Sequence, residues 1–214
     1  MEIERRVLQV EIRAAGDSDK PLIEGDAAVF NQETVIGEWF REMILPGAFK
    51  RILSEKPDVI AAYNHDWNIV LGRTTAGTLA LEETDKSLRY SAEINTKDPV
   101  AMGVYERVKR GDVSQASFAF KVRKEEWTSP AHRGELSLRT IIEIDKLYDV
   151  GPVTFGAYAE ASAQARSKAN EFLQIPDAAG GQEPPAGEQS DSAMQEQAGN
   201  ERRRLDFLRV KINP

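Results

Sequence analysis

Apolar residues recur at every second position through most of residues 1–161, and this spacing is typical of β-strands. The strands expected from it cover residues 2–14, 22–30, 59–63, 116–127 and 136–153. Two further alternating runs, 78–83 and 88–94, flank the polar residues 84–86 and predict a β-hairpin. The folded part of the chain should therefore be rich in strands.

Two segments have helical features instead. Residues 47–54 follow Pro46, and residues 98–109 carry Val104 and Val108 one helical turn apart before the stop at Gly111. Because the strands are not separated regularly by helices, a doubly wound sheet is disfavoured. The pattern predicts a β-rich α+β fold, a small closed or partly closed β-barrel flanked by a few helices.

The composition changes after the strand-rich region. Residues 175–200 consist mostly of Gln, Glu, Ala, Gly, Pro, Ser and Asp, which bury too little surface to offset the entropy of ordering. We expect a folded domain at 1–165, a flexible linker at 166–200 and a short basic-apolar segment at 201–214. The segment at 201–214 either docks on a partner or is a partly ordered tail. The folded domain is thus predicted to carry a disordered C-terminal extension.

Composition also limits the function. The 214 residues include no cysteine, which excludes disulfides, a cysteine nucleophile and thiolate metal sites and fits a reducing cytosol. A net charge of -7 disfavours a general nucleic-acid binder, and no apolar run is long enough to predict a membrane partner. Without clustered ligands or a Gly-rich phosphate loop, we expect neither a metal nor another cofactor.

The chain has two histidines, so imidazole chemistry has few possible locations. His65 follows a short strand in Tyr63-Asn64-His65-Asp66, whereas His132 lies in a polar turn and is assigned no role. Ser117 lies on a predicted strand, on the face opposite Phe118 and Phe120. Ser117 would become a nucleophile if a histidine took the proton of its hydroxyl. The alternative is that His65 is an ordinary surface or structural histidine and Ser117 an ordinary small residue of a strand.

A carboxylate is needed to orient such a histidine. With a turn near residues 130–134, Ser117 would lie opposite residues 143–147, which brings Glu143 and Asp145 within reach. Both could instead form the solvated side of a half-exposed strand. Ser114 remains a rival nucleophile, and the oxyanion donors could come from the loop after Trp127 or from the segment near Gly151 and Gly156.

Six segments, in this order, resemble the prohead (procapsid) maturation proteases of tailed bacteriophages. They begin at Gly25 (GDAAVFN), Glu42 (EMILPGAF), Tyr63 (YNHD, then VLGRT), Gly77 (GTLALEE), Arg110 (RGDVSQASFAFKV) and Leu147 (LYDVGPVTFGAY). Family members commonly have Ser-Pro-Val and Phe-Pro-Ala-Tyr where this chain has Gly151-Pro-Val and Phe155-Gly-Ala-Tyr. These departures affect the end of a strand and leave the proposed nucleophile and base unchanged.

The resemblance implies a fold similar to herpesvirus assemblin and a serine endopeptidase with His65, Ser117 and Glu143 as catalytic residues, Asp145 being the second choice for the third. Such an enzyme cuts the scaffolding portion from the major capsid protein, and cuts itself, inside the immature procapsid in the bacterial cytoplasm. Self-cleavage also implies a possible homo-oligomer. No cofactor is implied.

Two other functions remain open. The same fold could serve as a non-enzymatic internal scaffold or capsid-assembly module. A serine esterase is less favoured, because Ser117 follows Gln115-Ala116 and lacks the Gly-x-Ser-x-Gly elbow.

Overall fold

The computed structural model describes residues 3–8, 12–130, 132, 134–155, 168 and 172. By its internal contacts the chain divides into Met1–Pro176 and Asp177–Pro214, and every described residue belongs to the first unit. The predicted linker, apart from Lys168 and Phe172, lies outside the described residues. The predicted C-terminal segment and its disorder lie there as well.

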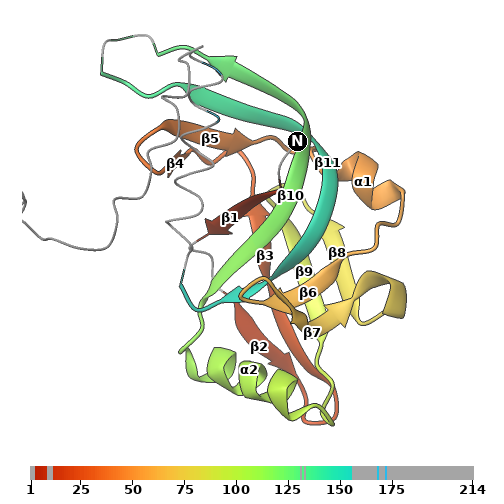
Figure 1. Ribbon diagram of the computed structural model, residues 1–214. Helices are drawn as coiled ribbons and strands as arrows, with labels where there is room; N and C mark the ends of the chain where they lie inside the picture. Colours follow the sequence, from red (N-terminus) through yellow and green to blue (C-terminus); the bar gives the residue numbers. More distant parts are fainter. Residues whose placement is uncertain are drawn as a thin grey trace, which may run out of the picture. The chain divides into compact units, whose positions relative to one another are not determined.

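Two sheets account for the strands of the described residues (Figure 1). The first has the order β1 (Glu4–Leu8), β10 (Gln115–Thr128), β11 (Leu138–Val153), β5 (Phe40–Ile44) and β4 (Thr34–Ile36), with β6 (Ile60–Tyr63) on β11 and β7 (Asp66–Arg73) on β6. The second has the order β2 (Arg13–Gly16), β3 (Pro21–Val29), β9 (Ser87–Glu93) and β8 (Leu79–Glu83). Helices α1 (Lys50–Ser54) and α2 (Pro99–Arg110) and the 3-10 turn η1 (Thr74–Ala76) complete the elements.

This architecture confirms the predicted β-rich α+β class with few helices. It contains no closed barrel among the described residues, because strand pairing links neither the two sheets nor the ends of each strand order. A barrel like that of the herpesvirus protease therefore stays a prediction.

The apolar faces of the two sheets pack on each other. Phe118 and Phe120 of β10, Ile23 of β3 and Leu88 of β9 are fully buried in one continuous cluster. Helix α2 is capped by the side chain of Asp98 and lies against this core through its buried apolar residues. Among the described residues, no helix combines the length and apolarity that crossing a bilayer requires.

Most predicted elements are present, with three differences. The strand expected at 2–14 is two strands, β1 and β2, which belong to different sheets. The first helix is a single turn that starts at Lys50. Strands β4, β5 and β7 were not expected, since β4 and β5 are short and exposed Trp67 and Val70 obscure the alternation of β7.

Strands β10 and β11 pair along their whole length, but not in the expected register. Ser117 lies opposite Gly151, where the sequence placed it opposite residues 143–147. Pairing begins at Thr128 and Leu138, and the four irregularities that follow shift the register along β11 by a net two residues, because three shift it forward and one shifts it back. A β-bulge inserts an extra residue on one strand, so each irregularity changes which side chains face each other.

A buried cluster of charges joins four strands of the larger sheet. Arg139 of β11 and Arg6 of β1 both donate to Glu42 of β5 and to Glu4 of β1, over 2.5 to 2.9 Å. Arg139 also donates to Glu125 of β10. We call these five residues the charge network; because it includes Glu4 and Arg6, it fixes β1 beside β10.

Candidate active site

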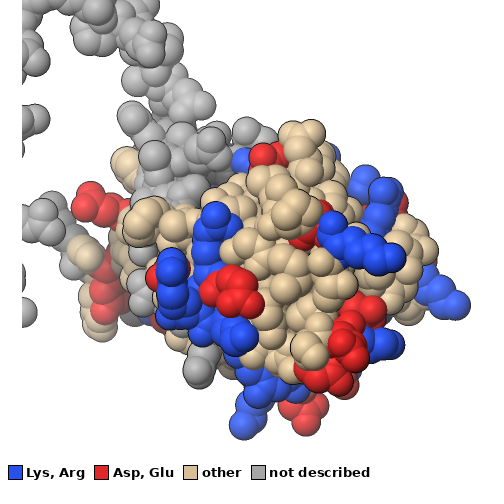
Figure 2. Space-filling view, turned by 90° about the horizontal axis from the view of Figure 1, so that it is seen from below, with Lys and Arg blue, Asp and Glu red and all other residues tan. Residues whose placement is uncertain are grey.

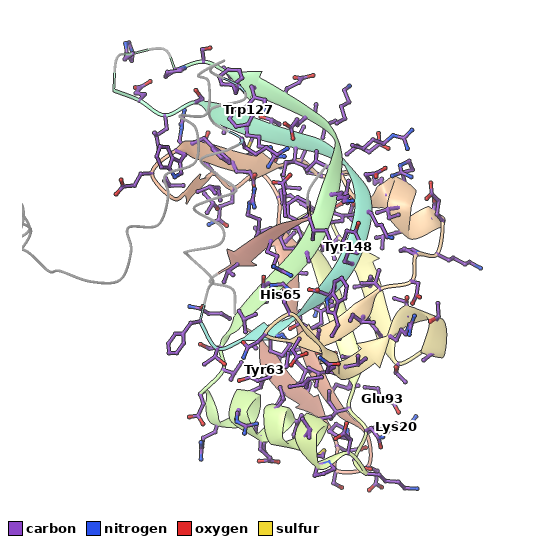
Figure 3. All side chains as sticks on the ribbon, viewed as in Figure 1. Lys20, Tyr63, His65, Glu93, Trp127 and Tyr148 are labelled. Carbon is purple, nitrogen blue, oxygen red and sulfur yellow. The ribbon has the colours of Figure 1, made fainter. Side chains whose placement is uncertain are left out.

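His65, Ser117 and Asp149 form a continuous chain of hydrogen bonds. The Nε2 atom of His65 lies 2.5 Å from Oγ of Ser117, and its Nδ1 atom lies 2.7 Å from Oδ1 of Asp149. Figure 3 labels His65, which comes from the β6–β7 hairpin while its two partners come from β10 and β11. Segments far apart in the sequence thus supply one site.

Ser117 is held in the middle of a paired strand. Strand β10 lies between β1 and β11, so that Ser117 faces Val7 on one side and Gly151 on the other. The side chain is fully buried, and its hydroxyl lies 2.8 Å from the carbonyl oxygen of Arg6. The strand β1 therefore contacts the nucleophile candidate directly.

A tight turn presents His65. Asn64 and His65 have positive φ values of 53° and 56°, and Tyr63 pairs with Asp66 across them. Positive φ at both central residues defines the two-residue hairpin turn that matches strand twist, and Asn is among the residues that tolerate it best. The imidazole is consequently fixed by the backbone of the hairpin.

Asn64 ties this turn to the end of β11. Its backbone N–H donates to the carbonyl of Pro152 over 3.0 Å, and its Oδ1 accepts from the backbone N–H of Thr154 over 2.8 Å. Tyr63 adds a contact between its hydroxyl and that of Thr154. The turn cannot shift without breaking bonds to β11.

Gly151 leaves space for the hairpin to cross β11. A Cβ atom at this position would lie 2.3 Å from the carbonyl oxygen of Ala62, and the φ of 151° is one that other residues rarely adopt. Any side chain at Gly151 would push β6 away and lift His65 from Ser117. The glycine is thus required by the site's geometry.

Asp149 is a carboxylate buried with partners on both oxygens. It is 1% exposed; Oδ1 accepts from His65, and Oδ2 accepts from the indole Nε1–H of Trp67 over 2.7 Å. A buried charge is tolerated only when it is paired in this way. Since an ionised carboxylate only accepts, the proton of neutral His65 lies on Nδ1, and Nε2 is free to accept one from Ser117.

The Ser117 hydroxyl has one proton and two nearby acceptors. It can donate either to Nε2 of His65 or to the carbonyl of Arg6. Donation to His65 is the arrangement from which proton transfer begins. Donation to the Arg6 carbonyl is the alternative, and it keeps the Ser117 oxygen in the same place.

The structure does not bring the predicted third residue, Glu143, to His65. Glu143 accepts from Nε of Arg51 over 2.5 Å, and Asp145 lies 3.8 Å from that guanidinium with half of its side chain exposed. The correction follows from the β10–β11 register, which places Glu143 opposite Lys124. The carboxylate on His65 is Asp149.

The other candidates also lie elsewhere. Ser114 is exposed and precedes the start of β10, and His132 is exposed in the loop between β10 and β11. Trp127 lies near the far end of β10 from His65 (Figure 3), so the loop after it is far from Ser117. Gly151 faces Ser117 directly, whereas Gly156 lies outside the described residues.

Sequence reasoning missed Asp149 and Trp67. Asp149 lies in the almost wholly apolar run Leu147–Val153, and a lone carboxylate in a buried run is itself a signal of a partner. Trp67 follows His65 by two residues but carries no pattern that assigns a role to its N–H. Its bond to Asp149 is visible only in the fold.

The arrangement suits acyl transfer. It combines a hydroxyl, an imidazole within proton-transfer distance and a carboxylate that fixes the tautomer of the imidazole. The three side chains provide the nucleophile, base and orienting group that such chemistry needs, and they lie on strands that hold them in place.

Comparison with known proteins agrees with this class of site. Residues 8–175 match the family of caudovirus prohead serine proteases. This match covers well over half of the chain, so the protein belongs to that family. The resemblance detected in the six sequence segments is thereby confirmed.

Two individual proteins are similar to the chain. The prohead protease of Enterobacteria phage HK97 is 28% identical over 159 residues, which are 73% of this chain and 65% of the relative. The chain thus aligns with less than two thirds of that relative's length. The bacteriophage T4 capsid assembly protease aligns with a TM-score of 0.40 at 10% identity, covering 72% of this chain and 98% of the other.

Proposed function

We propose that the protein is a serine endopeptidase of phage capsid maturation, with Ser117 as nucleophile, His65 as general base and Asp149 as the orienting carboxylate. The observation that carries this proposal is the Ser117–His65–Asp149 chain of hydrogen bonds in a member of the prohead protease family. In this proposal Asp149 has the role that the family resemblance implied for Glu143.

The proposed reaction proceeds in two halves. His65 takes the Ser117 proton on Nε2 while Oγ bonds to the carbonyl carbon of the scissile amide, and Asp149 stabilises the imidazolium. The imidazolium then gives that proton to the amine nitrogen as the carbon–nitrogen bond breaks. Water, deprotonated by His65, hydrolyses the acyl-serine and restores the hydroxyl. Backbone N–H groups near Ser117 would stabilise the oxyanion.

The proposed substrate is the scaffolding portion of the major capsid protein, together with the protease itself. The family name and the HK97 relative, a prohead protease, support this assignment. The enzyme would act inside the immature procapsid in the bacterial cytoplasm, where self-association of protease copies would permit cleavage of one by another. A fold like that of the herpesvirus protease belongs to the same proposal.

The face of the molecule in Figure 2 carries charges of both signs. On this face, Lys and Arg side chains are interspersed with Asp and Glu. Binding to a phosphate backbone depends on basic side chains gathered together, which this mixture does not offer.

The test is intact-mass analysis of the chain co-expressed with its capsid protein, for wild type, Ser117→Ala and Ser114→Ala. We expect shortened capsid protein and shortened protease with wild type and Ser114→Ala, and full-length masses with Ser117→Ala. Cleavage that survives Ser117→Ala but not Ser114→Ala would reassign the nucleophile. Uncut masses in all three samples, with the fold intact by circular dichroism, would favour the non-enzymatic scaffold.

A further inference from the structure

The indole of Trp67 joins the candidate active site to the molecular surface. Its Nε1–H donates to the buried Asp149 carboxylate, although 48% of the Trp67 residue is exposed. One oxygen of Asp149 is therefore fixed by His65 and the other by an exposed aromatic ring. Such a hydrogen bond prevents the carboxylate from rotating away from the imidazole.

Tyr148 holds this indole in place. The two rings stack with centroids 6.2 Å apart and planes inclined by 16°, and Tyr148 directly precedes Asp149 on β11. The ammonium groups of Lys146 and Lys121 lie 4.7 Å and 5.9 Å from the Tyr148 ring. The cation–π contacts thus hold the Tyr148 ring, and stacking on that ring restricts the orientation of the Trp67 indole.

The outer side of Trp67 lines a hollow of about 300 Å³. Its apolar lining consists of Trp67, Ile60, Val70 and Tyr148, and Val70 is 41% exposed. The volume is within the size range of small ligand sites, and exposed apolar surface next to polar chemistry is typical of binding sites.

The hollow also has three charged lining residues, Asp58, Arg73 and Lys146. Arg73 and Asp58 neutralise each other through two hydrogen bonds of 2.6 and 2.7 Å. Lys146 is exposed and lies over Tyr148. An apolar side chain placed against Trp67, Ile60 and Val70 would gain free energy from the burial of apolar surface.

We infer that this hollow is a substrate subsite for an apolar side chain of the cleaved peptide, and that Trp67 is a positioning residue that couples its occupancy to Asp149. The inference rests on the proposed protease function. The occupant is a peptide segment near the scissile bond, because the hollow begins one side chain away from Asp149. An extended peptide bound at Ser117 advances about 3.3 Å per residue, so side chains near the scissile bond are the ones to test against the hollow.

The coupling has a physical reason. A side chain that fills the hollow packs on the exposed face of the indole and excludes water from its edge. Without competing water, the Nε1–H bond to Asp149 becomes stronger, and the carboxylate holds His65 more firmly. Substrates that fill the hollow should therefore react faster, as well as bind more tightly, than those that leave it empty.

Trp67→Phe tests the positioning role. It keeps a ring beside Tyr148 and in the hollow but removes the N–H, so we expect kcat to fall about tenfold with KM nearly unchanged. The matched control is Trp127→Phe, which removes an indole N–H that donates to Glu125, well away from His65. An unchanged kcat in Trp67→Phe, or an equal fall in the control, would overturn the positioning role.

A second readout does not depend on cleavage. The chain has two histidines, so the hydrogen-bonded Nδ1 proton of His65 can be assigned by NMR with a His132→Gln variant. We expect Trp67→Phe to speed the exchange of this proton with water, because the Asp149 carboxylate is less firmly held. Exchange equal to that of wild type would contradict the inference.

Val70→Asn tests the subsite with peptides that span the mapped cleavage junction. Each residue within four positions of the cut bond is replaced in turn by Ser, and kcat/KM is measured with wild type and variant. We expect one apolar position at which Ser costs about tenfold in wild type and much less in Val70→Asn. If replacement by Ser lowered kcat/KM equally in wild type and Val70→Asn at every position, the subsite proposal would be wrong.

Ser117→Ala separates the two levels of the argument. If Ser117→Ala still cuts the peptides, the proposed function fails. If Ser117→Ala is inactive while Trp67→Phe and Val70→Asn behave as wild type, the protease stands and only the inference fails.

Discussion

The proposed site needs one carboxylate to orient His65, and two carboxylates on β11 differ in their burial and in their partners. Asp149 is buried and bonded to the imidazole, whereas Glu143 is partly exposed and bonded to Arg51. A solvated ion pair contributes little to function, while a buried carboxylate fixes the tautomer of the histidine and stabilises the imidazolium. The two residues should therefore respond very differently to the same kind of substitution.

Asp149→Asn should lower kcat about 10³- to 10⁴-fold, because an amide would favour the wrong tautomer of His65. Glu143→Gln is the matched control and should leave kcat within about twofold of wild type, with at most about 1 kcal/mol of lost stability. Cleavage rates of the capsid protein, measured by gel densitometry, compare them. A large loss in Glu143→Gln with an active Asp149→Asn would restore the assignment made from the sequence.

At this scale the sequence predicted His65 and Ser117 as partners, and the structure brings them together. The pair could be predicted because the chain has few histidines and because small residues surround Ser117. Asp149 could not be predicted in the same way, because its distance from His65 depends on the register of β10 and β11. The alternation that drew attention to Glu143 marks a half-exposed strand, which is where solvated charges usually lie.

Among the elements, the β6–β7 hairpin is the one that positions His65. Its turn places two residues other than glycine at positive φ, a conformation that costs free energy and is retained where the surroundings enforce it. Bonds from Asn64 to Pro152 and Thr154 provide that enforcement. The turn is therefore strained, and the bonds that hold it in this conformation also fix the position of the imidazole.

Asn64→Ala should reduce both stability and activity. Alanine tolerates positive φ less well than asparagine and lacks the bond to Thr154, so we expect a loss of about 1–2 kcal/mol and a fall in kcat of about tenfold. Asn31→Ala is the matched control, since Asn31 has a φ of 55° two residues after the end of β3, and its backbone N–H donates to the carbonyl of Ile44 in β5. Urea unfolding and cleavage rates are measured on both variants.

The control should lose similar stability with unchanged kcat for the folded protein. If Asn31→Ala lost as much activity as Asn64→Ala, general destabilisation would explain both results. The turn would then have no specific role in placing His65.

Element prediction from the sequence was limited by geometry that a pattern does not carry. Alternation predicted β10 and β11 and the β8–β9 hairpin, since period-two burial is a local property. The register between β10 and β11 depends on which residues pair first after the turn and on four irregularities that leave no clear local trace, and together these place Ser117 opposite Gly151. The role of Gly151 likewise depends on the approach of Ala62 from a distant strand.

For the described unit as a whole, the charge network links the larger sheet to the active site. Arg6 donates to the buried carboxylates with its side chain, and its carbonyl contacts the Ser117 hydroxyl. Lys168, beyond the last strand, lies 3.4 Å from Glu4 and so contacts the same network. Breaking a buried ion pair by removing one partner typically costs several kcal/mol, so this cluster makes β1 sensitive to protonation.

Acid should therefore destabilise the protein through Glu4. Burial by itself raises the pKa of the Glu4 carboxyl, but the hydrogen bond from Arg139 and the charges of Arg6 and Arg139 outweigh it and lower that pKa from 4.5 to about 2. A carboxyl with a lowered pKa contributes stability above its unfolded pKa and loses it as the pH falls through the folded one. About 3 kcal/mol should thus be lost between pH 4.5 and pH 2.

Urea unfolding at several pH values in this range checks the expectation. Glu4→Gln should be less stable than wild type at pH 7 and should show a shallower loss toward pH 2, because the titrating group is gone. Asp58→Asn is the control: hydrogen bonding to Arg73 also lowers the pKa of Asp58 to about 2, but this pair is exposed and screened by water. The Asp58→Asn variant should keep nearly the whole wild-type slope. If the Asp58→Asn variant flattened the slope as much as Glu4→Gln, exposed ion pairs rather than the buried charge network would control the stability in acid. The network would then not make β1 sensitive to protonation.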